Sequence, residues 1–286
     1  MLSSLPLVSI IIPSFNQGNF IEQTIKSILC QNYNNIEVIV VDGMSSDQTI
    51  EILNKYKNQI SYIHEPDSGQ SDAINKGLKL AKGEIISWLN SDDLYVNRNA
   101  ISKIVQKFET NKNIDFIYGD FLEIDNLNNI LRIYMRPAFS FNRLLRCGYI
   151  SQPSTFFTKR AIQNHTIRED LHLTMDTELW LRMSSLGYKF LHVNELIAAE
   201  RLHPSAKSVS LELEQMQEAK EVRMKHGATF DYMHSIMRFA DKFVLYWFRI
   251  RGGFKYALFD SSQFNINKNG SFVRTISPFK IKQKLK

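Results

Sequence analysis

The sequence predicts an α/β fold built on a doubly wound, mainly parallel sheet, and three observations support this prediction. Short β-branched runs alternate with amphipathic segments throughout the first half of the chain. The runs are almost continuously apolar, as expected for strands that are covered on both faces of a parallel sheet. The repeated order of strand and helix is typical of a doubly wound sheet flanked by helices.

The expected elements follow one another at regular intervals. Strands are expected at 8–12, 36–41, 61–64, 85–89, 116–118 and 190–193. Helices are expected after Asn19 and at about 46–57, 70–82, 97–109, 179–186 and 211–226. Asn19 is the expected N-cap of the first helix, because Glu22 follows three residues later in the pattern of a capping box. From 120 to 148 the pattern is too weak to assign elements.

Composition and charge set limits on the class of protein. The chain has 286 residues, 44% of them hydrophobic and 22% charged, which is typical of a soluble globular protein. Its two cysteines, Cys30 and Cys147, form no disulfide framework, so we expect a cytoplasmic protein. The first seven residues do not resemble a signal peptide, and no apolar run approaches the roughly 20 residues that span a bilayer. The net charge of +6 indicates an anionic partner, and nucleic acid, anionic lipid and a diphosphate ligand all remain open.

Polar side chains follow four of the predicted strands. They lie at 13–16, 42–47, 65–67 and 90–93. In open α/β sheets the ligand lies beyond the carboxyl ends of the strands, so these segments are expected to line one crevice. The sequence therefore predicts an acidic, amide-rich binding site at that edge.

Two of these segments carry carboxylates that suggest specific chemistry. Asp92 and Asp93 are adjacent, and such a pair repels itself unless a cation or hydrogen bonds offset the charge. Hard oxygen ligands suit Mg²⁺ or Mn²⁺; the alternative is that one of the two only caps the next helix. Asp47 is explained as a cap of the following helix. Asp42 precedes the Gly43 turn, so capping does not explain it, and it is positioned to accept a hydrogen bond from a base.

Three segments in this order resemble the family 2 glycosyltransferases, which have the GT-A fold. They read VSIIIPSFN at 8–16, VDGMSSDQT at 41–49 and LNSDD at 89–93. The resemblance covers roughly residues 5 to 210 and implies an inverting enzyme that uses a nucleotide-sugar donor, expected to be a UDP-sugar. It also implies Mn²⁺ or Mg²⁺ as cofactor and a saccharide or lipid-linked saccharide as acceptor.

The resemblance implies a role for each matching donor-side residue. Pro13, Phe15 and Asn16 would line the nucleobase pocket and Asp42 would bond the base, while Asp92 would bind ribose and Asp93 the metal on the donor diphosphate. The segment 69–77 also matches, but Ile74 stands where many members carry an arginine that faces the nucleotide. Asp72 and Lys76 are then the nearest donor-side substitutes; an exposed helix position is the alternative for Lys76.

A fourth matching segment, 175–182, carries the expected catalytic base. A sugar hydroxyl is a poor nucleophile at neutral pH, so a carboxylate must take its proton as the new bond forms. The family position assigns this role to Asp176, with Glu178 as a second acid on the acceptor side. Both acids would also favour a helix N-terminus, an effect compatible with catalysis. Met175 stands where the family usually has another acid.

Two further segments match the family more loosely. Gln152, Ser154 and Thr155 would lie beside the acceptor, with an amide and hydroxyls suited to sugar recognition. Arg201 would offset the charge of the diphosphate. His203 would ligate the metal or bond a phosphate, and a purely structural histidine is the alternative.

These implications define an expected organisation and two competing functions. A catalytic domain is expected at 1–210, with a nucleotide-binding half at 1–115 and an acceptor half at 116–210, followed by a helical extension at 211–286. A sugar-phosphate nucleotidyltransferase is one alternative, but the chain lacks the Gly-rich basic loop that such enzymes use. A non-catalytic nucleotide- or sugar-binding partner is the other, although a binding module needs no base such as Asp176. No nucleic-acid partner is expected.

The C-terminal extension is aromatic and basic. Aromatic residues from Phe239 to Phe248 are interleaved with lysines and arginines, and Lys280, Lys282, Lys284 and Lys286 add to the charge. This composition is typical of a helix at the interface of an anionic membrane. Packing of the aromatic face on the catalytic domain is an equal alternative. The expected location is therefore cytoplasmic, with a peripheral position on the inner membrane face left open.

Overall fold

The computed structural model describes residues 5–229 and 232–255, and it confirms the predicted α/β class. Its described strands form one nine-stranded sheet in the order β3-β2-β1-β4-β8-β6-β9-β5, with β7 paired to β6. The strands are β1 Val8–Ser14, β2 Ile36–Asp42, β3 Ser61–His64, β4 Ile85–Trp88, β5 Leu94–Tyr95, β6 Phe116–Ile124, β7 Ile130–Tyr134, β8 Thr155–Thr158 and β9 Phe190–Arg201.

The direction of each strand decides which strand ends lie at the same edge of the sheet. Strands β1 to β4 pair in parallel, as predicted, and β6 pairs in parallel with β9. Strand β8 runs antiparallel between β4 and β6, and β5 and β7 are also antiparallel to their neighbours. The carboxyl ends of β1, β2, β4, β6 and β9 consequently lie along the same edge of the sheet, where the site was predicted.

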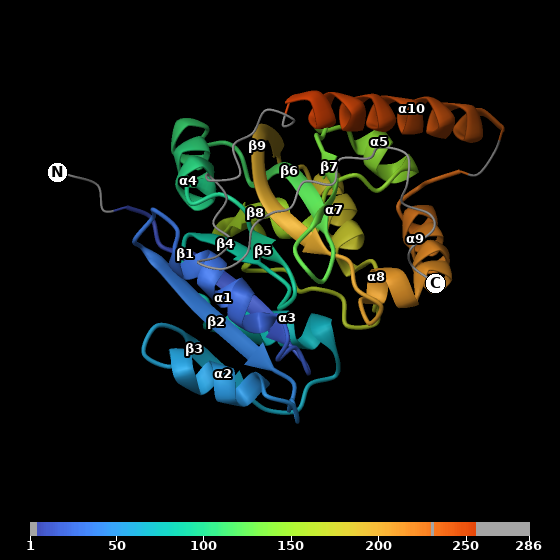
Figure 1. Cartoon of the computed structure of the whole chain (residues 1–286). Coiled ribbons are helices and arrows are strands. Elements are labelled where there is room, and N and C mark those ends of the chain that lie inside the picture. The colour runs from blue at the N-terminus through green and yellow to red at the C-terminus, as the bar shows by residue number, and fades with distance from the viewer. Residues whose placement is uncertain (1–4, 230–231, 256–286) are drawn as a thin grey trace.

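Helices cover both faces of the sheet (Figure 1). They are α1 Ile21–Leu29, α2 Thr49–Tyr56, α3 Gln70–Leu80, α4 Ala100–Thr110, α5 Phe141–Arg146, α6 Lys159–Ile162, α7 Met175–Ser185, α8 Lys207–Ser210, α9 Glu212–Lys225 and α10 Tyr232–Lys255, with a 3₁₀ turn, η1, at Gln152–Ser154.

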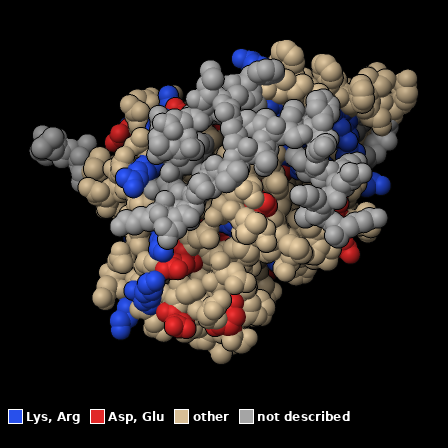
Figure 2. All heavy atoms as spheres, viewed as in Figure 1, with Lys and Arg blue, Asp and Glu red and all other residues tan. Residues whose placement is uncertain are grey.

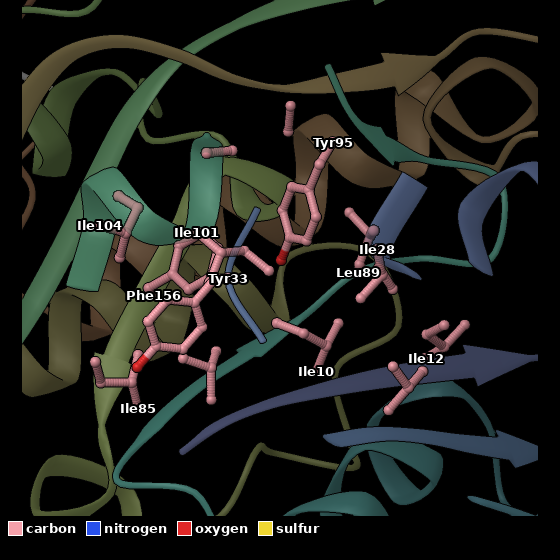
Figure 3. Close-up of a cluster of buried hydrophobic side chains, with 14 of the residues drawn as sticks. Ile10, Ile12, Ile28, Tyr33, Ile85, Leu89, Tyr95, Ile101, Ile104 and Phe156 are labelled. Atoms are coloured by element: carbon pink, nitrogen blue, oxygen red, sulfur yellow. The ribbon is translucent and has the colours of Figure 1, made fainter. Parts of the chain in front are cut away.

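Alternate side chains of β1 enter two different cores, which explains the continuous apolar run in the sequence. Ile10 and Ile12 pack with Ile25 of α1 and Ile104 of α4 in one cluster, part of which is drawn in Figure 3. Ile11 points to the other face, where the cluster includes residues of α3 and α7. Because both faces are buried, the sheet is held rigidly and its carboxyl edge is a stable platform for a site.

The predicted cap at Asn19 is wrong. Helix α1 begins at Ile21 with Phe20 at the N-cap position, and no side chain caps it. The carbonyl of Gln17 accepts hydrogen bonds from the N–H groups of both Phe20 and Ile21, each at 2.9 Å. A backbone carbonyl therefore takes the place of a capping side chain. The Asn19 side chain instead accepts a hydrogen bond from Gln48 at 3.3 Å.

Helix α10 packs on the domain with one face and exposes most of its aromatic side chains on the other, so the predicted membrane contact stays a prediction. One face packs on the domain through Leu245 and Phe248, and Asp241 forms ion pairs with Arg143 and Arg146 of α5. The other face exposes Tyr232, Met233, Ile236, Met237, Phe239, Phe243, Tyr246, Trp247 and Ile250. The helix lies along the end of the molecule beside α5 and β7 (Figure 1). The lysines at 280, 282, 284 and 286 lie outside the described residues.

Two surface properties bear on partners. Within residues 5–229 and 232–255, no helix has the length and hydropathy needed to cross a bilayer. Figure 2 shows acidic and basic side chains interspersed around the lower part of the described face.

Candidate active site

A cavity of about 1270 Å³ opens at the carboxyl edge of the sheet. Its volume exceeds the roughly 300–1,000 Å³ of a pocket for one small ligand, so it has room for two substrates. The predicted site residues that line it are Pro13, Phe15, Asp92, Asp93, Gln152, Asp176 and Arg201. The donor and acceptor sides predicted from the sequence are therefore parts of one cavity.

At the donor end, Phe15 is 60% exposed and lies with Pro13 on the cavity wall, as expected for a base-stacking surface. Asp42 is fully buried beneath that wall. Its carboxylate accepts hydrogen bonds from the N–H and the hydroxyl of Ser45, at 2.9 and 2.6 Å, and lies 2.6 Å from His64 Nδ1. The carboxylate thus organises the β2 turn, and its predicted contact with a base remains a prediction.

Gly43, which follows Asp42 in the chain, and Asp67 both line the donor end of the cavity. A Cβ atom on Gly43 would lie 2.4 Å from Asp67 Oδ2, so only glycine allows the carboxylate to approach this closely. Asp67 Oδ1 accepts a hydrogen bond from the Gly69 N–H at 2.9 Å, which fixes its orientation. Asp67 is an additional donor-side candidate.

The two other donor-side predictions, Asn16 and Asp72, do not line the cavity. Asn16 has a positive φ of 52°, and its side chain accepts a hydrogen bond from the Ser46 N–H at 2.9 Å. It therefore joins the loops after β1 and β2. Asp72 accepts a hydrogen bond from the Ser68 N–H at 3.0 Å and pairs with Lys76 at 3.4 Å, which holds the start of α3.

Asp92 and Asp93 occupy the centre of the cavity edge, between β4 and β9. Asp93 is 2% exposed, and its Oδ1 accepts a hydrogen bond from the Arg201 N–H at 2.9 Å. Burial, followed by the negative charges of Asp92 and Glu200, raises the pKa of Asp93 well above its ordinary range, although Arg201 acts in the opposite direction. Asp92 Oδ2 lies 3.0 Å from His203 Nε2. A divalent cation would offset the charge that these carboxylates accumulate.

The donor set fits a metal ion that is shared with a substrate. Asp93, Asp92 and His203 offer oxygen and nitrogen ligands, but the described residues contain no cluster of three or more potential ligand side chains arranged to hold an ion by themselves. Mg²⁺ is usually held by one or two carboxylates together with substrate phosphates and water, so an incomplete protein set is what that mode of binding requires. We therefore find the residues compatible with a metal bound together with a diphosphate.

The guanidinium group of Arg201 has structural partners. Its side chain donates to the carbonyls of Asp92 and Asp125 at 2.9 and 3.1 Å, and to the side chains of Asn128 and Gln23 at 2.6 and 3.0 Å. At 2% exposed, it links the end of β9 to three other segments. Its charge lies close to Asp93, but most of its N–H groups are already used, which argues against direct diphosphate binding.

On the acceptor side, Asp176 lies in the first turn of α7, partly buried in the cavity wall. Its Oδ1 accepts a hydrogen bond from the Thr177 N–H at 2.6 Å. Burial raises the pKa of Asp176 to about 6, while the Thr177 hydrogen bonds and the charge of Arg223 lower it in part. A carboxylate with this pKa is ionised at neutral pH and more basic than an ordinary aspartate, as a general base requires.

Only one of the other acceptor-side predictions reaches the cavity. Gln152 donates to the Trp88 carbonyl at 2.5 Å, and its Oε1 is buried without a hydrogen-bond partner among the described residues. The hydroxyls of Ser154 and Thr155 are buried and donate to the Ser151 carbonyl at 3.1 and 2.8 Å.

Glu178 also lies away from the cavity wall. It is 2% exposed, and its carboxylate accepts hydrogen bonds from Arg182 at 2.9 and 3.2 Å, one turn further along α7. Ser154, Thr155 and Glu178 are thus held by internal partners, because η1, β8 and α7 place those side chains towards the core. Their predicted contacts with an acceptor have no support in this geometry.

Glu200 and Arg136 are among the charged cavity residues that the sequence reasoning missed. Glu200 lines the cavity, and burial together with the charges of Glu123 and Asp176 raises its pKa to about 7. The sequence signal for Glu200 was its position as a charged residue directly after the apolar run 196–199. Arg136 lines the cavity with its guanidinium 4.7 and 4.8 Å from the ring centroids of Phe121 and Tyr134. It lies in the region whose pattern was too weak to assign.

The sheet topology is that of the GT-A fold, with carboxylates after β4 and a further one at the start of a helix across the cavity. The chain belongs to glycosyl transferase family 2, whose family model matches residues 9–171. The family resemblance stated from the sequence is thus confirmed.

Two relatives show how far the similarity extends in sequence. The chain is 30% identical over 268 residues to an uncharacterised glycosyltransferase of Rickettsia typhi, covering 83% of this chain and 80% of the relative. It is 29% identical over 213 residues to the hyaluronan synthase of Pasteurella multocida, covering 73% of this chain but only 22% of that much longer protein.

Two solved structures share the fold. S. aureus TarS in complex with UDP has a TM-score of 0.60 at 18% identity, covering 88% of this chain and 75% of that one. The mannosyltransferase PcManGT from Pyrobaculum calidifontis, in complex with GDP-Man and Mn²⁺, has a TM-score of 0.64 at 15% identity, with 90% and 77% covered. Both resemblances span most of the described sheet.

Proposed function

We propose that this glycosyltransferase moves a sugar from a UDP-sugar to an acceptor hydroxyl with inversion at the anomeric carbon. The observation that carries the proposal is the placement of Asp93 and Asp176 on the wall of one cavity, the first at the end of β4 and the second at the start of α7. A UDP donor is supported by the UDP complex of the structurally similar TarS, and a role in polysaccharide or glycolipid assembly by the similarity to hyaluronan synthase.

Leaving-group stabilisation and proton removal would take place at different ends of the cavity. Asp93, with Asp92 and His203, would hold Mn²⁺ or Mg²⁺ on the donor diphosphate, and the bound metal would stabilise the charge of the leaving group. Asp176 would take the proton of the attacking hydroxyl. Gln152 Oε1, which has no partner among the described residues, is available to orient that hydroxyl. A single displacement with the base opposite the leaving group inverts the configuration.

Donor turnover tests this proposal. Release of nucleoside diphosphate is measured across UDP- and GDP-sugars with Mn²⁺, Mg²⁺ or EDTA. We expect turnover that requires metal and is lost in Asp93→Asn and Asp176→Asn. Asp170→Asn is the matched control, because Asp170 is an exposed carboxylate that pairs with Arg168 and does not line the cavity. Activity that survives in Asp176→Asn would refute the assignment of the base.

We also propose that the exposed face of α10 contacts an anionic membrane, which would place a lipid-linked acceptor next to the cavity. The support is the exposure of Phe239, Phe243 and Trp247, at 76, 65 and 53%, on a helix whose opposite face is packed. Aromatic side chains favour the headgroup region. Flotation of the full chain with anionic vesicles should be lost when these three residues are changed to serine and kept in Leu213→Ser, a control on α9 that is 78% exposed. Equal flotation of both variants would exclude α10 as the contact.

A further inference from the structure

The acceptor end of the cavity carries cationic side chains that form no ion pair within the described residues. Arg223 of α9 and Arg238 and Lys242 of α10 line this end. The Nε atoms of Arg223 and Arg238 are both buried and have no hydrogen-bond partner among residues 5–229 and 232–255. A buried donor without a partner costs free energy, so an unexplained one in a native site indicates a missing water, ion or ligand group.

The two arginines are close enough to repel each other. Burial, followed by the positive charge of Arg238, lowers the pKa of Arg223, while Cys147 and Asp176 act in the opposite direction. Neither arginine forms an ion pair with a carboxylate in the described part of the chain. Like charges that face each other in a partly buried wall are destabilising unless an anion lies between them.

The nearest acidic residue of α10 does not relieve this charge. Asp241 is 7% exposed, and its two oxygens accept from Arg143 Nε at 3.2 Å and from Arg146 Nε at 2.6 Å. It is therefore already shared by two other arginines. Arg238 and Lys242 are four residues apart on α10, a spacing that places both on one face of the helix. The geometry thus leaves a cluster of three cations directed at the cavity.

We propose that Arg223, Arg238 and Lys242 form a subsite for the phosphate group of a phosphate-bearing acceptor. The inference rests on the proposed glycosyl transfer and specifies the class of acceptor. A phosphate monoester or diphosphate matches three cations better than a carboxylate does, because it carries about two negative charges and accepts bidentate hydrogen bonds from guanidinium groups. The subsite is on the acceptor side, since the charge of Arg223 acts on Asp176.

Calorimetric titration of the full chain tests the subsite. The protein is first saturated with UDP and Mn²⁺ so that the donor end is filled, and is then titrated with glucose 1-phosphate, methyl glucoside or glucuronate. We expect glucose 1-phosphate to bind at least tenfold more tightly than the neutral methyl glucoside. Arg223→Gln and Arg238→Gln should each weaken the phosphate ligand by about tenfold, the usual effect of removing a hydrogen bond to a charged group.

Matched controls remove one charge from the same helices without altering the cavity. Lys225→Gln on α9 and Arg251→Gln on α10 are exposed and do not line it, so they should bind glucose 1-phosphate as the wild type does. Equal weakening in these controls would show nonspecific attraction and overturn the proposal, as would tighter binding of glucuronate or no preference over methyl glucoside. The preceding UDP titration is read separately, so a protein that fails to bind UDP contradicts the proposed donor and not the subsite.

The source of the phosphate is distinguished by a second pair of probes. Hexyl phosphate and inorganic phosphate share the anion, but only the first has an alkyl chain to contact Leu245, which lies on α10 in the cavity wall. Tighter binding of hexyl phosphate that is lost in Leu245→Ala supports a lipid-linked acceptor. Equal binding of both, still weakened in Arg238→Gln, supports a water-soluble phosphate-bearing saccharide.

Discussion

Replacement of Asp176 by asparagine should make the protein more stable and nearly inactive. Asparagine keeps an oxygen that can accept the hydrogen bond from the Thr177 N–H, but it removes a charge that the folded protein disfavours. The pKa of Asp176 rises from 3.8 to about 6, chiefly through burial. That difference of about two pH units corresponds to an upper limit of about 3 kcal/mol. Because water in the cavity screens the charge, we expect roughly 1–2 kcal/mol.

The sign of the pH dependence follows from the two pKa values. Well below pH 3.8, Asp176 is protonated in both the folded and the unfolded state, so the variant and the wild type should be equally stable in this respect. As the pH rises from 4 to 6, the unfolded chain ionises before the folded one and the wild type loses stability. Above pH 6 the gain of the asparagine variant should be constant.

Denaturant unfolding of both proteins at several pH values between 4 and 8 measures this gain. Thermal unfolding should show a rise of roughly 2–8 °C at pH 8, since 1 kcal/mol moves the midpoint of a domain of this size by about 2–4 °C. Turnover should fall by roughly 100- to 10,000-fold. A variant that is less stable than the wild type at pH 8, or equally stabilised at pH 4 and pH 8, would refute the reasoning.

Asp47 provides a control of opposite sign. Burial raises its pKa, but hydrogen bonds from the Thr49 side chain and the Gly18 and Thr49 N–H groups outweigh that effect, and the net pKa is lowered. Its ionised form is therefore favoured by folding, so Asp47→Asn should lose stability at neutral pH and regain parity with the wild type in acid.

Three other predictions follow from the same site. In the wild type, kcat/KM should fall on the acid side of about pH 6 as Asp176 becomes protonated, and a flat profile between pH 5 and 8 would contradict its role as the base. Gly43→Ala should displace the Asp67 carboxylate, which lies 2.4 Å from the added Cβ, and weaken UDP binding in a calorimetric titration; Asp67→Ala in the same chain should relieve the strain without restoring the affinity. Arg201→Leu should lower the free energy of unfolding by about 3–5 kcal/mol without nucleotide, because it leaves the buried acceptors of the guanidinium group unpaired. A change confined to UDP affinity would instead identify Arg201 as a diphosphate ligand.

Residues whose position depends on local structure could be predicted from the sequence. Asp92 and Asp93 lie in the short loop after β4, and Asp176 lies in the first turn of a helix, so the period of the apolar pattern is enough to place them on the cavity edge. Phe15 and Pro13 are found in the same way after β1. In each case the element that positions the side chain is its immediate neighbour in the chain.

Side-chain orientation depended on packing that the sequence does not show. Ser154, Thr155 and Glu178 have the right chemistry for an acceptor site, but their hydroxyls and carboxylate are turned towards internal partners. For Glu178 a local signal existed, since Arg182 lies four residues later, at the spacing of a helical ion pair. For Asp42 no such signal existed, because His64 reaches it from the neighbouring strand.

The cavity is acidic on the donor side of Asp176 and basic on its acceptor side. Carboxylates dominate the donor end, where Glu200 raises the pKa of Asp93 and Asp92 raises that of Glu200, and arginines of α9 and α10 dominate the acceptor end. Asp176 is influenced by both ends, because Glu200 repels its charge and Arg223 stabilises it. A cation at the donor end would favour ionised carboxylates there, whereas an anion bound to Arg223 would cancel the stabilisation of Asp176 and raise its pKa further. The two ends therefore act on Asp176 in opposite directions: a cation at the donor end favours its ionised form, and an anion on Arg223 favours its protonated form.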